Sequence, residues 1–259
     1  MKKKILIISG NLLKHQFFSI RILKRFQNSH LVIENYPTNI YKNYTKDHSN
    51  IIKNHFKMVK NYENKYFKKY VTNNISYIKK KTLFKFDKGE VNKKKYFNKI
   101  KKLKPDLIVL NATSILNKNY IKQFKNKIIN FHAGYMPFYR GSGCNVWAFY
   151  HKELNYVGVT IHFVDSKIDH GNIIYREKPK FAKNDNTHSI GCKNSIIGSN
   201  LAIKAIQKIL KNPNYKGKKY KAQRNKFCKK KDFNSKVVTK INYLIKNGLV
   251  KDFLKLDHK

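Results

Sequence analysis

Short aliphatic runs recur along the chain and predict the strands of a buried sheet. They lie at residues 5–8, 31–33, 106–110, 127–130 and 158–164. Runs this short and continuous are typical of parallel strands that helices cover on both faces. Apolar residues also recur at helical spacing, at 17–26, 186–210 and 237–245. We therefore predict an α/β protein with a Rossmann-like, open, mostly parallel sheet and helices on both of its faces.

A basic and aromatic segment interrupts this alternation from about residue 41 to residue 104. Apolar residues such as Ile52 and Phe56 still recur at helical spacing there. We expect a basic insertion of two or three amphipathic helices, the last ending before Pro105, because proline disfavours helical geometry in the residue ahead of it. Four aromatic residues among its lysines either pack these helices onto the sheet or stack on a nucleotide base: Tyr66, Phe67, Tyr70 and Tyr77.

The length of 259 residues and the hydrophobic content of 41% allow one α/β core with appendages. We expect a catalytic domain at residues 1–211, which includes the insertion, and a basic C-terminal extension at 212–259 that carries a short helix. The apolar run at 5–8 stops at Ser9-Gly10, too early for a signal-peptide core or a membrane span. The expectation is a cytoplasmic protein, and the sequence leaves its oligomeric state open, a homodimer included.

The formal charge of +43, from 57 Lys and Arg against 14 Asp and Glu, would attract nucleic acid or anionic lipid at low salt. However, the excess is mostly lysine, runs along the whole chain and accompanies abundant Asn, Ile and Tyr, so a compositional bias explains it. We therefore do not expect nucleic acid as a partner, and a nucleic-acid-binding module is the non-enzyme alternative.

The cysteines and histidines do not show the spacing of a metal site. Cys144, Cys192 and Cys228 lie far apart without a C-x-x-C pair, which argues against a disulfide framework and the usual zinc patterns. Several histidines with nearby aspartates leave a zinc hydrolase as a second alternative, but no H-E-x-x-H motif is present. No metal is expected.

The candidate chemistry lies in two loops that follow predicted strands. Asn130 and His132 are two residues apart, so they share one face of a strand that ends in a glycine-rich loop. A second loop, at 165–172, supplies Asp169. Ligands of open α/β sheets bind at such strand ends. Taken singly, the asparagine could cap a turn, the histidine could be a core residue and the aspartate could belong to an ordinary turn.

An amide, an imidazole and a carboxylate in one crevice suit acyl transfer to an amine. Asn130 and His132 can donate hydrogen bonds to the oxygen on which negative charge develops. The attacking nitrogen must also lose a proton, and we expect a partly buried Asp169 with a raised pKa to relay it, directly or through water.

Several ordered motifs between about residues 105 and 174 resemble the folate-dependent formyltransferase family. They are Asn130-x-His132, Pro137, Arg140-Gly141, Trp147-Ala148, Gly158-Val159-Thr160 and Ile168-Asp169-x-Gly171-x-Ile173-Ile174. The family includes the enzymes that formylate glycinamide ribonucleotide, methionyl-tRNA and nucleotide-linked amino sugars. The resemblance extends plausibly to residues 1–35, but not to the basic insertion or the tail.

By this resemblance, Asn130, His132 and Asp169 are the catalytic residues. The backbone of Ser114, Ile115 and Leu116 is expected to hold the pterin ring of the co-substrate 10-formyltetrahydrofolate. The loop containing Asp165 and Ile168 is expected to close over the other side of the ring. One departure is Gly134, where the family often has serine.

The acceptor amine is inferred from the remaining motifs. Glycinamide ribonucleotide is disfavoured because the phosphate-cradling Gly-Ser-Asn turn is missing after the first strand. Transfer RNA is disfavoured because too few residues follow Lys211 for the β-barrel domain that grips it. The loop from Arg140 to Trp147 looks most like the amino-sugar branch. We therefore expect a nucleotide-linked amino sugar, bound by Gly10, Arg140, Gly141, Asn145 and Trp147.

Overall fold

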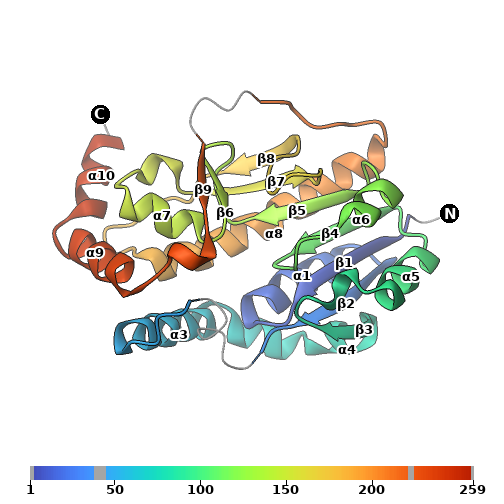
Figure 1. Ribbon diagram of the computed structural model, residues 1–259, viewed down its shortest axis with the longest axis horizontal. Helices are drawn as coiled ribbons and strands as arrows, with labels where there is room; N and C mark the ends of the chain where they lie inside the picture. The colour runs from blue at the N-terminus through green and yellow to red at the C-terminus, as the bar shows by residue number, and fades with distance from the viewer. Residues whose placement is uncertain (1–2, 38–44, 221–224, 258–259) are drawn as a thin grey trace.

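A computed structural model describes residues 3–37, 45–220 and 225–257. Its centre is a seven-stranded sheet of order β3-β2-β1-β4-β5-β7-β8 (Figure 1). The strands from β3 to β5 are parallel, whereas β7 is antiparallel to β5 and to β8. Their bounds are β1 Ile5–Gly10, β2 Ser29–Asn35, β3 Thr82–Asp87, β4 Leu107–Asn111, β5 Ile128–His132, β7 Val159–Phe163 and β8 Ile173–Glu177.

Helices cover both faces of the sheet, which explains why its inner strands β1 and β4 begin with unbroken apolar runs. In β1, Ile5 and Ile7 join the core on one face, while Leu6 and Ile8 join the core on the other. The first face carries α1 Leu13–Arg25, α3 Asn50–Asn73, α4 Ile75–Lys81 and α8 Thr187–Lys211. The second face carries α5 Lys94–Lys102, α6 Lys118–Gln123 and the short turn η1 Glu90–Asn92.

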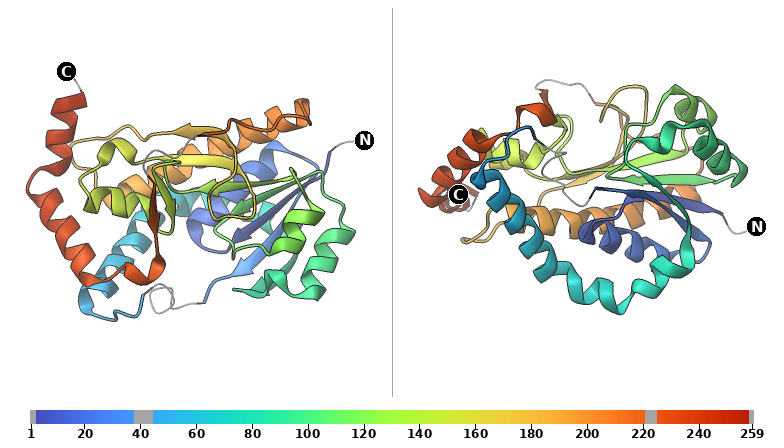
Figure 2. Two further views of the ribbon diagram at one scale, coloured as in Figure 1. Left: turned by 45° about the horizontal axis from the view of Figure 1, so that its top comes forward. Right: turned by 60° about the horizontal axis from the view of Figure 1, so that its bottom comes forward.

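The C-terminal segment packs at one end of the molecule (Figure 2). A third apolar cluster there includes residues of α7 Cys144–Tyr150, η2 Leu154–Tyr156, α9 Ser235–Lys246 and α10 Leu249–Asp257, and the short turn η3 Lys230–Asp232 lies just ahead of α9. The short strands β6 Tyr139–Gly141 and β9 Lys226–Cys228 pair in parallel beside α7. The Asp47 carboxylate accepts from the Ser235 backbone N–H at 2.6 Å, so the segment ahead of α3 is tied to the start of α9.

The predicted fold class is confirmed, but the segment at 41–104 is not wholly helical. Its first four residues lie outside the described ranges, and its residues 82–87 form the edge strand β3. In this strand Leu83 is exposed and Phe86 is buried, so one face is solvated and the other packs on the core. Such an edge strand, within a lysine-rich stretch, lacks the continuous apolar run that identified the inner strands. The prediction also missed β8 and the second C-terminal helix.

The aromatic residues of the basic segment are packing residues. Phe67 is fully buried, and Tyr66, Tyr70 and Tyr77 are partly buried against the same core. Their rings are therefore not a free platform for a nucleotide base. Among the described residues, we find no helix with both the length and the apolar content that a membrane crossing requires.

Candidate active site

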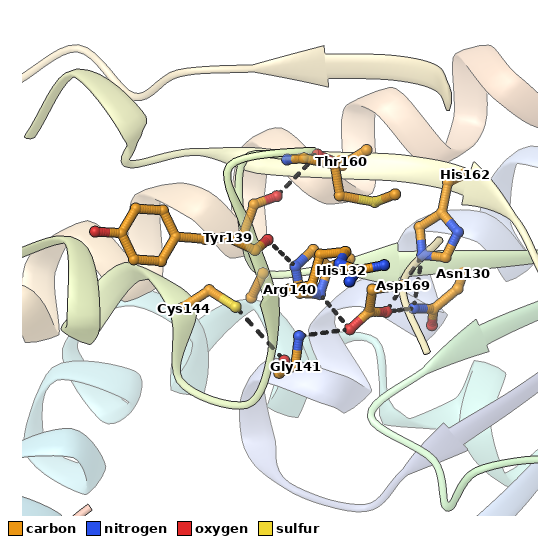
Figure 3. A network of polar contacts seen from close by, with 12 residues as sticks. Asn130, His132, Tyr139, Arg140, Gly141, Cys144, Thr160, His162 and Asp169 are labelled. Carbon is orange, nitrogen blue, oxygen red and sulfur yellow. Dashed lines mark hydrogen bonds and ion pairs between the residues drawn. The ribbon is translucent and has the colours of Figure 1, made fainter. Parts of the chain in front are cut away.

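The pairing of β5 with β7 sets the position of the catalytic candidates. In this antiparallel pair Asn130 lies opposite His162, and His132 lies opposite Thr160. The loop after β7 then turns back and points Asp169 toward both histidines and Asn130 (Figure 3). The backbone φ angle of Asp169 is +45°. A left-handed conformation is uncommon for a residue other than glycine and is characteristic of functional sites.

The carboxylate of Asp169 is surrounded by hydrogen-bond donors. Its Oδ2 accepts from the Gly141 backbone N–H at 3.0 Å and lies 3.3 Å from His132 Nδ1. Its Oδ1 accepts from Asn130 Nδ2 at 3.3 Å and lies 3.4 Å from His162 Nε2. The structure thus brings together the three predicted catalytic residues and two further groups.

The Asp169 carboxylate is ionised at neutral pH. Burial raises its pKa, but the two histidine rings and the Gly141 N–H outweigh burial and hold the pKa well below its ordinary range. The expectation of a raised pKa is therefore wrong. The sequence suggested burial of this side chain but not the number of donors that converge on it.

His132 has an acceptor at each ring nitrogen. Nδ1 faces the Asp169 carboxylate, and Nε2 lies 3.1 Å from the Tyr139 carbonyl oxygen. Burial lowers the pKa of His132, and the Asp169 charge offsets this only partly, so the ring is neutral at neutral pH. A neutral imidazole has one N–H and can satisfy only one of the two acceptors. A proton gained during turnover would complete both hydrogen bonds.

His162 orients the amide of Asn130. Its Nδ1 lies 2.7 Å from the Phe163 carbonyl, and its Nε2 lies 3.2 Å from Asn130 Nδ2 and 3.4 Å from Asp169 Oδ1. The Asn130 amide nitrogen thereby lies within hydrogen-bonding distance of both His162 and Asp169. His162 was not among the predicted catalytic residues. Its position two residues after Thr160, on the strand leading to the Asp169 loop, was the available signal.

Gly134 is required by the position of His132. A Cβ atom on Gly134 would lie 2.3 Å from His132 Nε2 and 2.7 Å from the Cys144 Cβ. The departure from the serine that is frequent in the family is thus a packing feature of this chain. The Gly134 loop is fastened by Thr160, whose Oγ1 donates to the Gly134 carbonyl and accepts from the Met136 N–H.

The predicted folate-binding residues lie in loops next to the catalytic residues. Ser114 donates from its backbone N–H to the buried Glu34 at 2.6 Å, so this N–H is already used within the protein. Leu116 is buried, whereas Ile115 is 67% exposed and Ile168 is 39% exposed. Large apolar side chains this exposed, in the loop after β4 and directly ahead of Asp169, suit contact with an aromatic ring system.

Asp165 shapes its own loop. Its Oδ1 accepts from the Lys167 N–H at 2.9 Å, and its Oδ2 lies 2.8 Å from His170 Nδ1. The next turn of the loop is completed by Tyr220, whose hydroxyl donates to the His170 carbonyl. Asp165 therefore supports the conformation from which Asp169 projects.

The predicted acceptor-binding residues do not form one group. Gly141 contacts Asp169 directly, and Arg140 donates from Nε to Asn225 Oδ1 at 2.8 Å. The Asn145 amide is used at both ends, donating to the Ala133 carbonyl and accepting from the Gly158 N–H, so it joins two loops. Trp147 lines a separate surface hollow with residues of β9.

Gly10 lies at the carboxyl end of β1 and is covered by two rings. A Cβ atom there would lie 2.4 Å from His15 Nδ1 and 2.8 Å from the Tyr36 ring. The helix that follows begins after Leu12, which provides no side-chain cap. Side chains thus fill the turn in which a phosphate would need free backbone N–H groups.

Within residues 3–37, 45–220 and 225–257, no three His, Cys, Asp or Glu side chains are arranged to hold a metal ion.

Known proteins of similar sequence include methionyl-tRNA formyltransferases. A methionyl-tRNA formyltransferase from Thermodesulfovibrio yellowstonii is 32% identical over 117 residues, which are 45% of this chain and 38% of that protein. The match therefore spans well under half of that relative's length.

Solved structures with 16–19% identity share the fold. A sugar N-formyltransferase from a Shewanella species has a TM-score of 0.57 over 88% of this chain and 77% of its own. An N-formyltransferase from Helicobacter canadensis, in complex with folinic acid and dTDP-3-aminofucose, has a TM-score of 0.56 over 91% of this chain and 72% of its own. Phosphoribosylglycinamide formyltransferases share it too, for example that of Streptococcus pneumoniae, with 16% identity and a TM-score of 0.54 over 80% of this chain and 99% of its own. The sequence pattern of the formyl transferase family matches residues 4–206. This chain belongs to the formyl transferase family.

Proposed function

We propose that this protein transfers a formyl group from 10-formyltetrahydrofolate to a primary amine. The observation that carries the proposal is the ionised Asp169 carboxylate, held between Asn130 and His132 of β5 and the Gly141 N–H. Direct attack by the amine on the formyl carbon requires no nucleophilic side chain.

Each catalytic residue has one task in this reaction. As the amine nitrogen bonds to the formyl carbon, negative charge gathers on the formyl oxygen. Asn130 can donate to that oxygen by exchanging its contact with His162, and each such donor contributes about 3–4 kcal/mol to transition-state stabilisation. The attacking nitrogen becomes cationic and must lose a proton.

The carboxylate and the imidazole share that proton. Asp169 is a weak base because its pKa is low, so it accepts the proton only transiently, directly or through His132, whose Nδ1 lies 3.3 Å away. A protonated His132 would satisfy both Asp169 and the Tyr139 carbonyl. The proton is then available for the folate nitrogen as the bond between this nitrogen and the formyl carbon breaks.

The acceptor that we propose is the amino group of a nucleotide-linked amino sugar. Sugar N-formyltransferases share the fold over 88% and 91% of this chain, including one in complex with dTDP-3-aminofucose. Glycinamide ribonucleotide is the second candidate. The rings of His15 and Tyr36 over Gly10 weigh against it, because they occupy the turn that would hold its phosphate.

The test is formyl transfer to a panel of acceptors. Purified protein would be incubated with 10-formyltetrahydrofolate and nucleotide-linked amino sugars, glycinamide ribonucleotide or methionyl-tRNA, and products would be scanned for the mass of one added formyl group. We expect an amino sugar to be formylated, and the Asp169→Asn variant to leave it unchanged. Formylation of glycinamide ribonucleotide alone would contradict the proposed acceptor, and no formylation of any amine would contradict the reaction.

A further inference from the structure

Two cysteines meet directly behind the catalytic loop. Cys228 is the register partner of Gly141 in the β6–β9 pair, and its carbonyl accepts from the Ser142 N–H at 2.9 Å. Cys144, at the start of α7, places its Sγ 3.6 Å from the Gly141 carbonyl oxygen. The two side chains are thus gathered around one residue, and each thiol shifts the pKa of the other.

The two thiols differ in access and in charge. Cys144 is 1% exposed, whereas Cys228 is 7% exposed and lines a surface hollow of about 390 Å³ with Trp147 and Lys226. The Cys144 thiol and the Lys226 charge lower the pKa of Cys228, and burial only partly opposes them. Burial raises the pKa of Cys144. Cys228 is therefore the more accessible of the two thiols and the one whose pKa is lowered, and Cys144 is placed to attack it afterwards.

We propose that Cys144 and Cys228 form a redox-active dithiol that a hydroperoxide oxidises to an intramolecular disulfide. The Cys228 thiolate attacks a peroxide oxygen, the O–O bond breaks, and hydroxide leaves with the former thiol proton as water, which yields a sulfenic acid. The Cys144 sulfur then attacks the Cys228 sulfur, the S–O bond breaks, and the hydroxide takes the Cys144 proton as a second water. Two electrons pass from the two sulfurs to the peroxide.

The disulfide would join the C-terminal segment to the loop that orients Asp169. Residues 226–228 lie beyond the part that matches the family, whereas Gly141 donates its N–H to the catalytic carboxylate. Cross-linking residues so far apart in sequence restricts the unfolded chain, so the oxidised form should unfold at a temperature roughly 5–10 °C higher than the reduced form.

The third cysteine is a built-in control. Cys192 is buried in the core between the sheet and α8, away from both of the others, and burial raises its pKa to about 12. Reduced protein would be treated with stoichiometric hydrogen peroxide, alkylated and analysed by intact mass and peptide mapping. We expect the loss of two hydrogen atoms, a peptide link between Cys144 and Cys228, and reversal by dithiothreitol.

Single variants separate the two roles. In Cys144→Ser the sulfenic acid on Cys228 should persist and be trapped by dimedone, whereas Cys228→Ser should give neither dimedone labelling at Cys144 nor a disulfide. Cys192→Ser should behave like the parent. A parent protein that forms no internal link, or that links through Cys192 or between molecules, would overturn the proposal. Mass is the readout, so the result does not depend on which amine is formylated.

Discussion

Replacing Asp169 with asparagine removes the charge of the site with almost no change in volume. The carboxylate lies within 3.0–3.4 Å of four nitrogen atoms, those of Gly141, Asn130, His132 and His162. An amide has one acceptor oxygen and one donor nitrogen. If the oxygen stays with the Gly141 N–H, the amide nitrogen faces Asn130 Nδ2, and two donors meet.

The two consequences have different magnitudes. One donor left without an acceptor costs about 1–3 kcal/mol of folding stability. Loss of the proton acceptor lowers the rate by a factor of about 10²–10⁴. We expect turnover to fall by about 10³, which corresponds to about 4 kcal/mol in activation free energy. Folate affinity should change little, because the proposed ring contacts are with Ile115 and Ile168.

The assay separates these effects. Initial rates at saturating 10-formyltetrahydrofolate and acceptor give kcat, and calorimetry with the unreactive 5-formyl isomer gives the folate dissociation constant. A thermal melt shows whether Asp169→Asn is folded at the assay temperature. A folded variant whose kcat stays within tenfold of the parent would refute the assignment of Asp169 as the proton acceptor.

Three further perturbations probe the surroundings of this carboxylate. His162→Gln should retain an acceptor for Asn130 and lower kcat by less than tenfold, whereas His162→Ala should lower kcat by a factor of roughly 10². Equal losses of kcat in the two variants would exclude a role of His162 in positioning Asn130. Gly134→Ser should displace the His132 ring and lower kcat at least tenfold, while folate affinity, measured by calorimetry, is retained. Burial lowers the pKa of His55 to about 4, so the unfolded chain binds its proton first as pH falls. Denaturant titrations should therefore show a contribution of His55 to the free energy of unfolding that is fully present above about pH 6.5. This contribution should fall by about 1.4 kcal/mol per pH unit down to about pH 4. The His55→Gln variant should lack this pH dependence.

The parts of the fold that the sequence revealed are those with a local cause. Ile5 to Ile8 alternate between two cores, so a continuous apolar run was sufficient to identify a central strand. Asn130 and His132 share a face because strand periodicity is two. The edge strand at 82–87 was missed because its outward positions are solvated and resemble the lysine-rich helices around it.

The electrostatics of the site depended on contacts distant in sequence. The pKa direction of Asp169 is set by Gly141, His132 and His162, which arrive from β6, β5 and β7. Burial alone would have raised this pKa, as the sequence led us to expect.

The change from parallel to antiparallel pairing after β5 is what makes the site possible. The carboxyl end of β5 meets the amino-terminal half of β7, so His132 is opposite Thr160 and Asn130 is opposite His162. If β7 ran parallel to β5, the two strands would end side by side, and the loop after β7 would begin beside His132, at the edge of the sheet where β5 ends. Instead, the chain passes Asn130 and returns through the left-handed Asp169, which directs the carboxylate back between the two strands. The left-handed backbone of Asp169 and the polar groups around its side chain thus have one result, a carboxylate that stays ionised although it is largely shielded from solvent.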